Sequence, residues 1–502
     1  MNGSNSEQRV RAIQSLARER LDVLVIGGGI VGSGVARDAA LRGLRTGLID
    51  RYDFAFGTSS RSSRLLHGGI RYLAQGRLGL VRQASVEKDI LHRIAPHLAQ
   101  PLPFLFPAFR GTDWPFWQLR IGVKFYDFLS HPRGGGGSGA LDRNQVLALL
   151  PGLREEGLAG AVTYSDSLTN DARLVLDTLR SAEMAGAIPA NYVKFDRAER
   201  LPGSFLCHVT DQRTGRSFKI QARSVVNATG PWSEAIPPSG VRLRLTKGIH
   251  LVFHRDRLPV SRAVVITEGA RILFVIPWGE RVIVGTTDTD YDAAPEAVHT
   301  QPEDARYLLR AIHRFFPNVA LTEQDVVSSW AGLRPLLSDP NGRPSDISRS
   351  HRIENPHPGW WDAAGGKLTT YRLMAEQTMD RVARFLGGNI GPCRTADQPL
   401  LPLEAVRGVS QITPPEFRRA VVEHYCASEW AVHLDDVMMR RSSWHFYHPH
   451  AGELGRRTAV WMSEILGWNA ARQTEELQRY ARLSDWPPVA TANTDQILQP
   501  AA

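Results

Sequence analysis

The fold of this chain is decided by one stretch, Leu21–Gly32, which reads LDVLVIGGGIVG. Its first half, Leu21–Ile26, is a short and almost wholly apolar run that predicts a buried strand. Three glycines follow, and a helical pattern then continues to about Arg42. A second strand-like run, Thr46–Ile49, ends at Asp50. A strand, a glycine turn, a helix and a strand that ends in an acid together predict a dinucleotide-binding βαβ unit.

Three glycines of this stretch, in the pattern Gly-x-Gly-x-x-Gly, have distinct expected roles. Gly27 allows the tight turn, Gly29 lets a pyrophosphate approach the backbone, and Gly32 lets the helix pack on the strand. The helix N-terminus offers unpaired amides and the positive end of the helix dipole to phosphates. Asp50, eighteen residues after Gly32, is expected to accept hydrogen bonds from the ribose of adenosine.

Two later glycine-rich turns favour a flavin over a nicotinamide cofactor. Asn227–Gly230 ends a strand-like region at 190–226, and Gly365–Thr370 enters a predicted helix over 370–386, where a threonine can cap the first turn. The positive end of that helix could stabilise negative charge on a reduced flavin. Three separate approaches suit a long cofactor such as FAD. A nicotinamide enzyme, with one compact cofactor domain, is the alternative.

Composition narrows the class of protein. The chain has 502 residues, of which 42% are hydrophobic and 22% charged, and this excludes a disordered or fibrous chain. No apolar run is long enough to span a membrane, and the first twenty residues lack a signal peptide's apolar core. The net charge of +9 favours anionic partners such as phosphate esters, but it is mild for this length, and we expect no nucleic acid.

The cysteines argue against structural cross-links. Cys207, Cys393 and Cys426 are far apart, odd in number and outside any Cys/His cluster. We therefore expect neither disulfides nor a metal site, and a reducing cytoplasm as the location.

The rest of the chain shows further strands and then helices. Strand-like runs occur at 251–253, 272–276 and 282–284, and helical patterns at 416–425 and 458–483 indicate a separate helical unit from about residue 392. At the N-terminus, residues 1–20 have apolar side chains at helical spacing among arginines. A membrane-surface helix is one interpretation of them, and a solvated tail is the favoured one.

The stretch Gly57–Tyr72, GTSSRSSRLLHGGIRY, closely resembles the flavin-and-substrate loop of FAD-dependent, quinone-linked glycerol-3-phosphate dehydrogenases. The resemblance extends over about residues 20–390. Further motifs that are similar, in the family's order, are Tyr164-Ser165-Asp166, Asn170–Leu174, Ala228–Trp232, Lys247–His250, Ile276–Trp278, Gly285–Asp288, Gly332–Pro335 and Gly366–Arg372.

The resemblance implies an α/β fold with an FAD-binding domain of the two-dinucleotide-binding kind, as in glutathione reductase and D-amino-acid oxidase. That domain would be discontinuous, formed by residues 20–100, 160–232 and 330–388. A mainly antiparallel substrate domain would comprise 101–159 and 233–329, and 389–502 would form a small, shortened helical C-terminal domain. The implied reaction is oxidation of sn-glycerol 3-phosphate to dihydroxyacetone phosphate by hydride transfer to FAD. Electrons would pass to a membrane quinone from a cytoplasmic enzyme, peripheral on the inner face of the membrane.

The resemblance also implies the site residues. The candidates for proton transfer are His67, His250 and Lys367, and the general base stays open among them. The residues expected to bind substrate are Arg71, His250, Arg334, Arg349 and Lys367. The residues expected to bind the cofactor are Gly27, Gly29, Gly32, Asp50, Thr58, Ser59, Ser60, His67, Gly68, Gly69, Ala228, Thr229, Gly230, Lys367, Leu368 and Thr369.

Two features and two alternatives qualify this interpretation. Arg64 stands where the family usually has lysine, and a planar guanidinium is not equivalent to a compact ammonium group. The aromatic and basic segment of Trp114, Phe116, Trp117, Arg120, Lys124, Phe125, Tyr126 and Phe128 suits either core packing, which is favoured, or contact with a membrane. The alternative functions are another flavin oxidase or dehydrogenase acting on a hydroxy acid or amino acid, and an inactive flavin-binding protein. The acceptor (quinone or oxygen) and a homodimer are left open.

Overall fold

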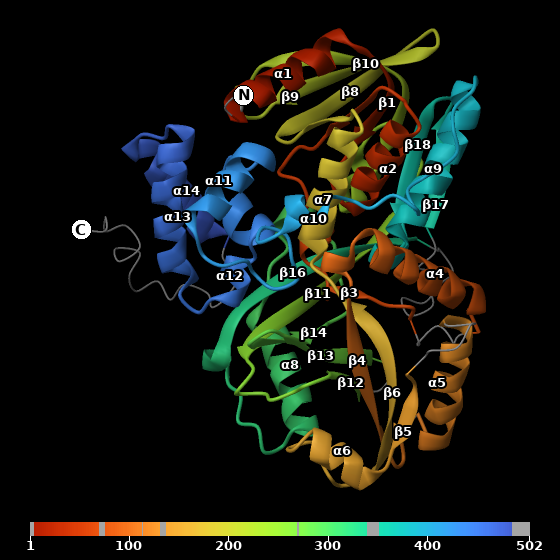
Figure 1. Ribbon diagram of the computed structural model, residues 1–502, viewed down its shortest axis with the longest axis vertical. Coiled ribbons are helices and arrows are strands. Elements are labelled where there is room, and N and C mark those ends of the chain that lie inside the picture. The colour runs from red at the N-terminus through yellow and green to blue at the C-terminus, as the bar shows by residue number, and fades with distance from the viewer. Residues whose placement is uncertain are drawn as a thin grey trace.

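A computed structural model describes residues 5–69, 76–112, 114–130, 137–268, 271–338 and 351–483 (Figure 1). Two sheets form the body of the protein, with helices packed against them. The C-terminal helices lie to one side, beside both sheets (Figure 1).

The first sheet has the strand order β17-β18-β10-β1-β2-β7, and β8 and β9 extend it beside β10. Its centre is parallel, because β1 pairs in parallel with both β2 and β10. β1 is almost wholly buried, which explains its continuous apolar run. The bounds are β1 (Arg20–Ile26), β2 (Thr46–Ile49), β7 (Ile188–Ala190), β8 (Val193–Leu201), β9 (Ser204–Asp211), β10 (Ser217–Asn227), β17 (His351–His357) and β18 (Trp360–Gly365).

Three helices cover one face of this sheet: α2 (Ile30–Leu41), α7 (Asp171–Met184) and α9 (Tyr371–Leu386). They lie next to one another in Figure 1. The Asn170 side chain caps α7 by accepting a hydrogen bond from the Arg173 amide. The other face packs on α1 (Asn5–Arg18) and on apolar side chains of β8 and β9.

The N-terminal expectation was wrong. α1 is a docked helix rather than a solvated tail, because Leu16 is fully buried and Arg9 forms an ion pair of 2.6 Å with Asp211. Its apolar residue Leu16 packs on the first sheet, which leaves that side chain unavailable to a membrane.

The second sheet is mainly antiparallel, with the order β15-β11-β14-β13-β12-β4-β6-β3, β16 beside β11 and β5 beside β6. α8 packs over it with the apolar core of residues around Leu251 and Ile312. The strands are β3 (Leu65–Leu66), β4 (Gln100–Phe109), β5 (Gly139–Leu141), β6 (Leu158–Leu168), β11 (Leu243–His254), β12 (Ala263–Glu268), β13 (Arg271–Trp278), β14 (Arg281–Gly285), β15 (Thr289–Asp290) and β16 (Val326–Leu337). The helices are α4 (Leu78–Ile94), α5 (Phe116–Ser130), α6 (Arg143–Leu149) and α8 (Pro302–Phe315).

The C-terminal helices share one apolar core with the second sheet. Trp444 and Tyr425 lie in the same buried cluster as Trp278 and Trp330 of the sheet. The elements are α10 (Leu403–Val406), α11 (Arg419–Ser428), a π-helical turn (Asp436–Arg441), α12 (Trp444–Tyr447), α13 (Ala451–Leu466) and α14 (Ala470–Arg482).

The strand–turn–helix–strand prediction is confirmed, since β2 spans Thr46–Ile49 as expected and α2 ends one residue before Arg42. The predicted helix over 370–386 is α9, which begins one residue later. β6 and β16, which the sequence division assigns largely to the cofactor unit, pair within the second sheet. The division into three units therefore stays a prediction.

Candidate active site

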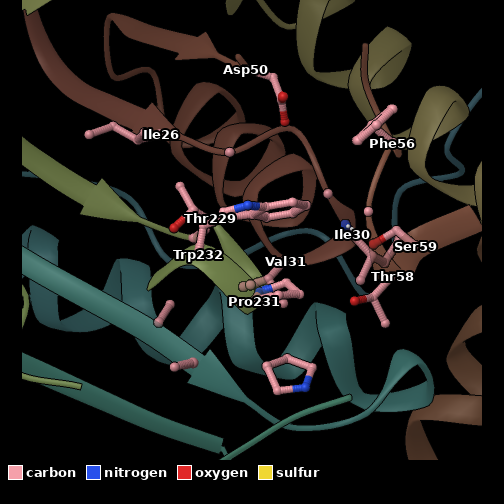
Figure 2. A pocket seen from close by; sticks show the side chains of 18 of the residues that line it. Ile26, Ile30, Val31, Asp50, Phe56, Thr58, Ser59, Thr229, Pro231 and Trp232 are labelled. Carbon is pink, nitrogen blue, oxygen red and sulfur yellow. Dashed lines mark hydrogen bonds between the residues drawn. The ribbon is translucent and has the colours of Figure 1, made fainter. Parts of the chain in front are cut away.

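A cavity of about 470 Å³ opens where β1, β2 and β10 end (Figure 2). The register places Ile26 beside both Ile49 and Asn227, so the residues that follow these strands meet at one edge. This is where an open α/β sheet binds its ligand. The predicted cofactor residues that line it are Gly27, Gly29, Asp50, Thr58, Ser59, Ala228, Thr229, Gly230, Lys367 and Leu368.

The glycine turn has the geometry that a dinucleotide requires. Gly27 has a φ of +107°, and a Cβ on Gly32 would lie 1.8 Å from the Gly27 carbonyl oxygen. A Cβ on Gly29 would meet only the Ser59 hydroxyl, at 3.2 Å, so the backbone there is open to the cavity. Larger residues are therefore excluded at Gly27 and Gly32 for reasons of folding, and Gly29 is suited to close approach by a phosphate.

Asp50 stands at the edge of this cavity and is tied to the turn. Its carboxylate accepts hydrogen bonds from the amides of Gly28 at 2.7 Å and Tyr52 at 2.8 Å. Desolvation raises the pKa of Asp50 to about 7, although both amides act to lower it. The carboxyl is thus poised to ionise when a hydrogen-bond donor binds beside it.

A second cavity, of about 780 Å³, adjoins the first. The two share Thr58, Ser62, Pro335, Gly366, Lys367 and Leu368 in their walls. Four predicted site residues from separate parts of the chain meet in its lining: His67 after β3, His250 in β11, Arg334 in β16 and Lys367 after β18. The structure therefore joins the cavity at the glycine turn to a second cavity that is lined by cationic and imidazole side chains.

His250 is buried and held on three sides. Its Nε2 shares a hydrogen bond of 2.8 Å with the Ser63 hydroxyl, and its ring stacks on the Trp330 indole at 5.2 Å. It faces Gly285 across the β11–β14 pair, where a Cβ would lie 2.3 Å from the His250 ring. Burial, followed by Arg334 and Arg64, lowers the pKa of His250 to about 3. The imidazole is therefore neutral at physiological pH, and an anion bound beside Arg334 would raise its basicity.

Arg334 lies across the strand pair β11–β16 and points toward the 286–288 turn. Its guanidinium donates to the Thr286 hydroxyl at 3.0 Å, the Thr287 carbonyl at 3.2 Å and the Asp288 carboxylate at 3.1 Å. A Cβ on Gly248 would lie 2.4 Å from the Arg334 Nη2, so this glycine makes room for the side chain. The fork is thus fixed in place on the wall of the second cavity.

The loop that carries His67 is held by hydrogen bonds, one of them to the buried carboxylate of Asp166. The His67 amide donates to Thr369 at 3.0 Å, and the Gly68 amide donates to Asp166 at 3.2 Å. The same Asp166 oxygen accepts from Lys88 at 3.0 Å and from the Tyr126 hydroxyl at 2.7 Å. Sequence reasoning noted the Tyr-Ser-Asp motif but did not assign Asp166 this supporting role.

The C-terminal segment contacts residues that lie behind the wall of the second cavity. Arg64 is fully buried, lies 4.2 Å from the Trp278 ring and 5.3 Å from the Trp330 ring, and donates to the Ser443 hydroxyl at 3.2 Å. The Phe446 ring meets Trp330 edge-on at 5.3 Å. The contacts of Phe446 with Trp330 and of Trp330 with His250 thus connect the C-terminal segment to a residue that lines the second cavity, which sequence reasoning missed.

Some predicted residues lie elsewhere. Arg71 and Arg349 fall outside the described residues. Gly32, Ser60, Gly68 and Thr369 support the turns and loops without lining either cavity, whereas His67 and Gly69 line the second. No group of three or more His, Cys, Asp or Glu side chains with metal-site geometry occurs among the residues that the structure describes.

Comparison with known proteins decides the family. Residues 22–381 match the family described as "DAO: FAD dependent oxidoreductase". The chain belongs to the FAD-dependent oxidoreductases. A glycerol-3-phosphate dehydrogenase 2 of Mycobacterium tuberculosis is 33% identical over 545 residues, covering 98% of this chain and 92% of the relative. The aerobic glycerol-3-phosphate dehydrogenase of Bacillus subtilis is 37% identical, covering 79% and 73% respectively. The chain thus belongs to the glycerol-3-phosphate dehydrogenases within this oxidoreductase family.

Solved structures agree with this assignment. The glycerol-3-phosphate dehydrogenase of Bacillus halodurans, whose crystal structure contains FAD, superposes with a TM-score of 0.76 at 29% identity, covering 95% of this chain and 97% of that one. An L-α-glycerophosphate oxidase of Mycoplasma pneumoniae, at 18% identity and a TM-score of 0.60, shares the fold. The predicted fold class and the FAD cofactor of this flavoprotein are therefore confirmed, and the nicotinamide alternative is wrong.

Proposed function

We propose that this flavoprotein oxidises sn-glycerol 3-phosphate to dihydroxyacetone phosphate and passes the electrons to a membrane quinone. The observation that carries the proposal is the second cavity, which Arg334, Lys367 and His250 line beside the cavity at the glycine turn. The relatives named above as glycerol-3-phosphate dehydrogenases support the substrate.

The first cavity would hold FAD through the turns already described. Gly29 and the start of α2 would take the pyrophosphate, and Asp50 the adenosine ribose. Thr58, Ser59 and the Ala228–Gly230 turn would complete the walls. The Lys367–Thr369 turn would lie at the flavin end, since it borders both cavities. Bound FAD supplies the hydride-accepting chemistry.

The second cavity would hold the phosphate ester and its hydroxyl. A phosphate ester carries a charge near −2, and a fixed guanidinium fork suits two of its oxygens. We assign this role to Arg334, with Lys367 as a second cation. His250 is our first candidate to accept the proton of the substrate hydroxyl, because Ser63 and Trp330 fix its ring. His67 and Lys367 stay candidates, as both line the same cavity.

Anaerobic titration of the purified protein tests this proposal. The protein is expected to be yellow, and glycerol 3-phosphate is expected to bleach the flavin absorbance, whereas glycerol, lactate and an amino acid are not. Glycerol is the matched control, because it keeps the hydroxyls and lacks the phosphate. Bleaching by lactate or an amino acid would reassign the substrate to a hydroxy or amino acid. A protein that no substrate bleaches would be a flavin-binding protein without this activity.

The affinity for FAD is expected to depend on pH through Asp50. A ribose hydroxyl donates best to the ionised carboxylate, so FAD binding favours ionisation of Asp50. Because the pKa of Asp50 is raised to about 7, the carboxyl is protonated below neutral pH and must release a proton when FAD binds. The apparent Kd of the apoprotein is expected to be about tenfold weaker at one unit below that pKa than well above it. Fluorescence titration with FAD measures this. In Asp50→Asn the affinity should be weaker and independent of pH; an unaltered slope would contradict the assignment.

The quinone acceptor places one further demand on the protein. Quinones are dissolved in the bilayer, so a protein that reduces them must meet the membrane surface. No helix among the described residues is both long and apolar enough to cross a membrane. We therefore propose a peripheral location on the inner face of the cytoplasmic membrane. Reduction of vesicle-borne quinone, compared with reduction of a water-soluble dye, tests the acceptor.

A further inference from the structure

One face of α5 carries four large apolar side chains that are well exposed. Trp117, Ile121, Phe125 and Phe128 are exposed by 61, 63, 41 and 67%. Their spacing of four, four and three residues places them on one side of the helix. We call these four residues the α5 stripe. The opposite side packs into the core, as in the case of Tyr126, which is 1% exposed.

Basic residues accompany the α5 stripe. Arg120 and Lys124 line the same surface hollow as the four apolar residues, together with Gly139 and Ala140 of β5. The acid on this helix, Asp127, accepts a hydrogen bond from the Ser138 amide at 2.9 Å. The hollow is therefore lined by the apolar stripe and two basic side chains, with no acidic side chain among the residues that line it.

The neighbouring helix α4 also exposes apolar and basic side chains. It packs against α5, as Figure 1 also shows. It exposes Leu78 and Val86, by 42 and 51%, and also Arg82. Two adjacent helices thus present apolar and basic side chains outward from the second sheet.

We propose that the α5 stripe docks this protein on an anionic lipid bilayer. The inference rests on the proposed function only in that a quinone acceptor requires such contact. Aromatic and aliphatic residues flanked by Lys and Arg suit the boundary between headgroups and acyl chains. The stripe extends about 16 Å along the helix, long enough for shallow insertion of one helix face. A second copy is a poorer occupant, because a two-fold contact would place Arg120 and Lys124 close to their own counterparts.

The inner side of α5 lies next to the loop of the candidate active site. The Tyr126 hydroxyl donates to Asp166, which also holds the Gly68 amide beside His67. Docking through the stripe would therefore bring the second cavity close to the bilayer, where a lipid-soluble acceptor resides.

Vesicle binding by the holoenzyme tests the proposal. The double variant Phe125→Gln/Phe128→Gln is compared with Phe385→Gln/Val460→Gln, whose side chains are each 43% exposed on α9 and α13. On vesicles of phosphatidylcholine with phosphatidylglycerol, the first variant is expected to bind at least about tenfold more weakly than the unaltered protein, and the control equally well. Omitting phosphatidylglycerol is expected to weaken binding, because basic residues contribute to it. Flavin content and thermal midpoint confirm that the variants are folded.

Trp117 provides a second readout. Lipids brominated in the acyl chains are expected to quench its fluorescence, measured as the difference between the unaltered protein and Trp117→Phe. Equal binding of both double variants, or no quenching of Trp117 on bound vesicles, would overturn the proposal. A dimer that dissociates in the stripe variant, seen by analytical ultracentrifugation, would instead make this face an interface between copies.

The test separates this inference from the proposed function. The stripe variant is expected to keep bleaching of its flavin by glycerol 3-phosphate and to lose at least about tenfold in reduction of vesicle-borne quinone. If vesicles bind as expected but glycerol 3-phosphate does not bleach the flavin, the docking surface stands and the assigned substrate is rejected.

Discussion

Arg334→Ala is expected to lower kcat/KM for glycerol 3-phosphate by about 10²- to 10³-fold. Two hydrogen bonds from a guanidinium to a phosphate contribute about 3–4 kcal/mol together, and each 1.36 kcal/mol corresponds to tenfold. Because Arg334 lines the second cavity and not the first, flavin content should not change. Stopped-flow reduction of the flavin by glycerol 3-phosphate measures the effect.

Two controls sharpen the Arg334 experiment. Arg334→Lys keeps the positive charge and loses the planar guanidinium, so its kcat/KM is expected to lie between those of the unaltered protein and Arg334→Ala. Arg242→Ala removes an arginine whose side chain is 73% exposed, and should leave the kinetics unchanged. If Arg334→Ala reduces as fast as the unaltered protein at low substrate, Arg334 is not the phosphate-binding residue.

Asp53→Ala is expected to destabilise the protein by about 3–5 kcal/mol, because it leaves the buried Arg441 without a carboxylate partner and removes one of the three carboxylates that pair with the buried Arg440. Asp53 is fully buried and accepts hydrogen bonds from Arg440 at 2.5 Å, from both Nη atoms of Arg441 and from Asn191 at 3.0 Å. The denaturant midpoint and the thermal midpoint of the holoprotein measure the loss. Glu416→Gln is the control. It removes an ion pair whose two side chains are exposed, so both midpoints should stay unchanged.

The same pair of arginines gives the destabilisation a pH dependence. Burial alone would raise the pKa of Asp53, but Arg441 and Arg440 hold it below its ordinary value. The contribution of Asp53 is therefore present above the pKa of the unfolded chain, near 4, and is lost as pH falls through the lower folded value. The gap in stability between the unaltered protein and the variant should thus narrow in acid. A constant gap, or no gap at neutral pH, would contradict the buried ion pairs.

The cofactor half of the fold could be predicted because its signals are local. An apolar run buried on both faces, a glycine turn and a terminal acid occur within thirty residues, Leu21 to Asp50, and each has one physical reason to be there. The site residues in the second cavity came from the family resemblance instead. Their motifs are separated by hundreds of positions, and nothing local indicates that His67 and Arg334 line one pocket.

The supporting residues could not be predicted, for a related reason. Ser63, Trp330 and Asp166 act by contact with residues from other elements, and such contacts exist only once the chain has folded. The segment around α5 is different, because its signal was in the sequence. Helical spacing alone separates the buried Tyr126 from four exposed residues, Trp117, Ile121, Phe125 and Phe128. One side of this helix therefore packs in the core, and another side is exposed at the surface.

The contacts of the π-helical turn have a consequence for how the protein is made. Asp53 and Arg441 lie 388 positions apart, and Ser443, which holds Arg64, is later still. A growing chain folds from its N-terminus as it leaves the ribosome. Until the last quarter of the chain has emerged, the Asp53 carboxylate has no arginine partner and Arg64 has no hydroxyl to bind. Nascent chains that stop before residue 436 are therefore expected to bind no flavin, and the cofactor is expected to enter only after synthesis is nearly complete.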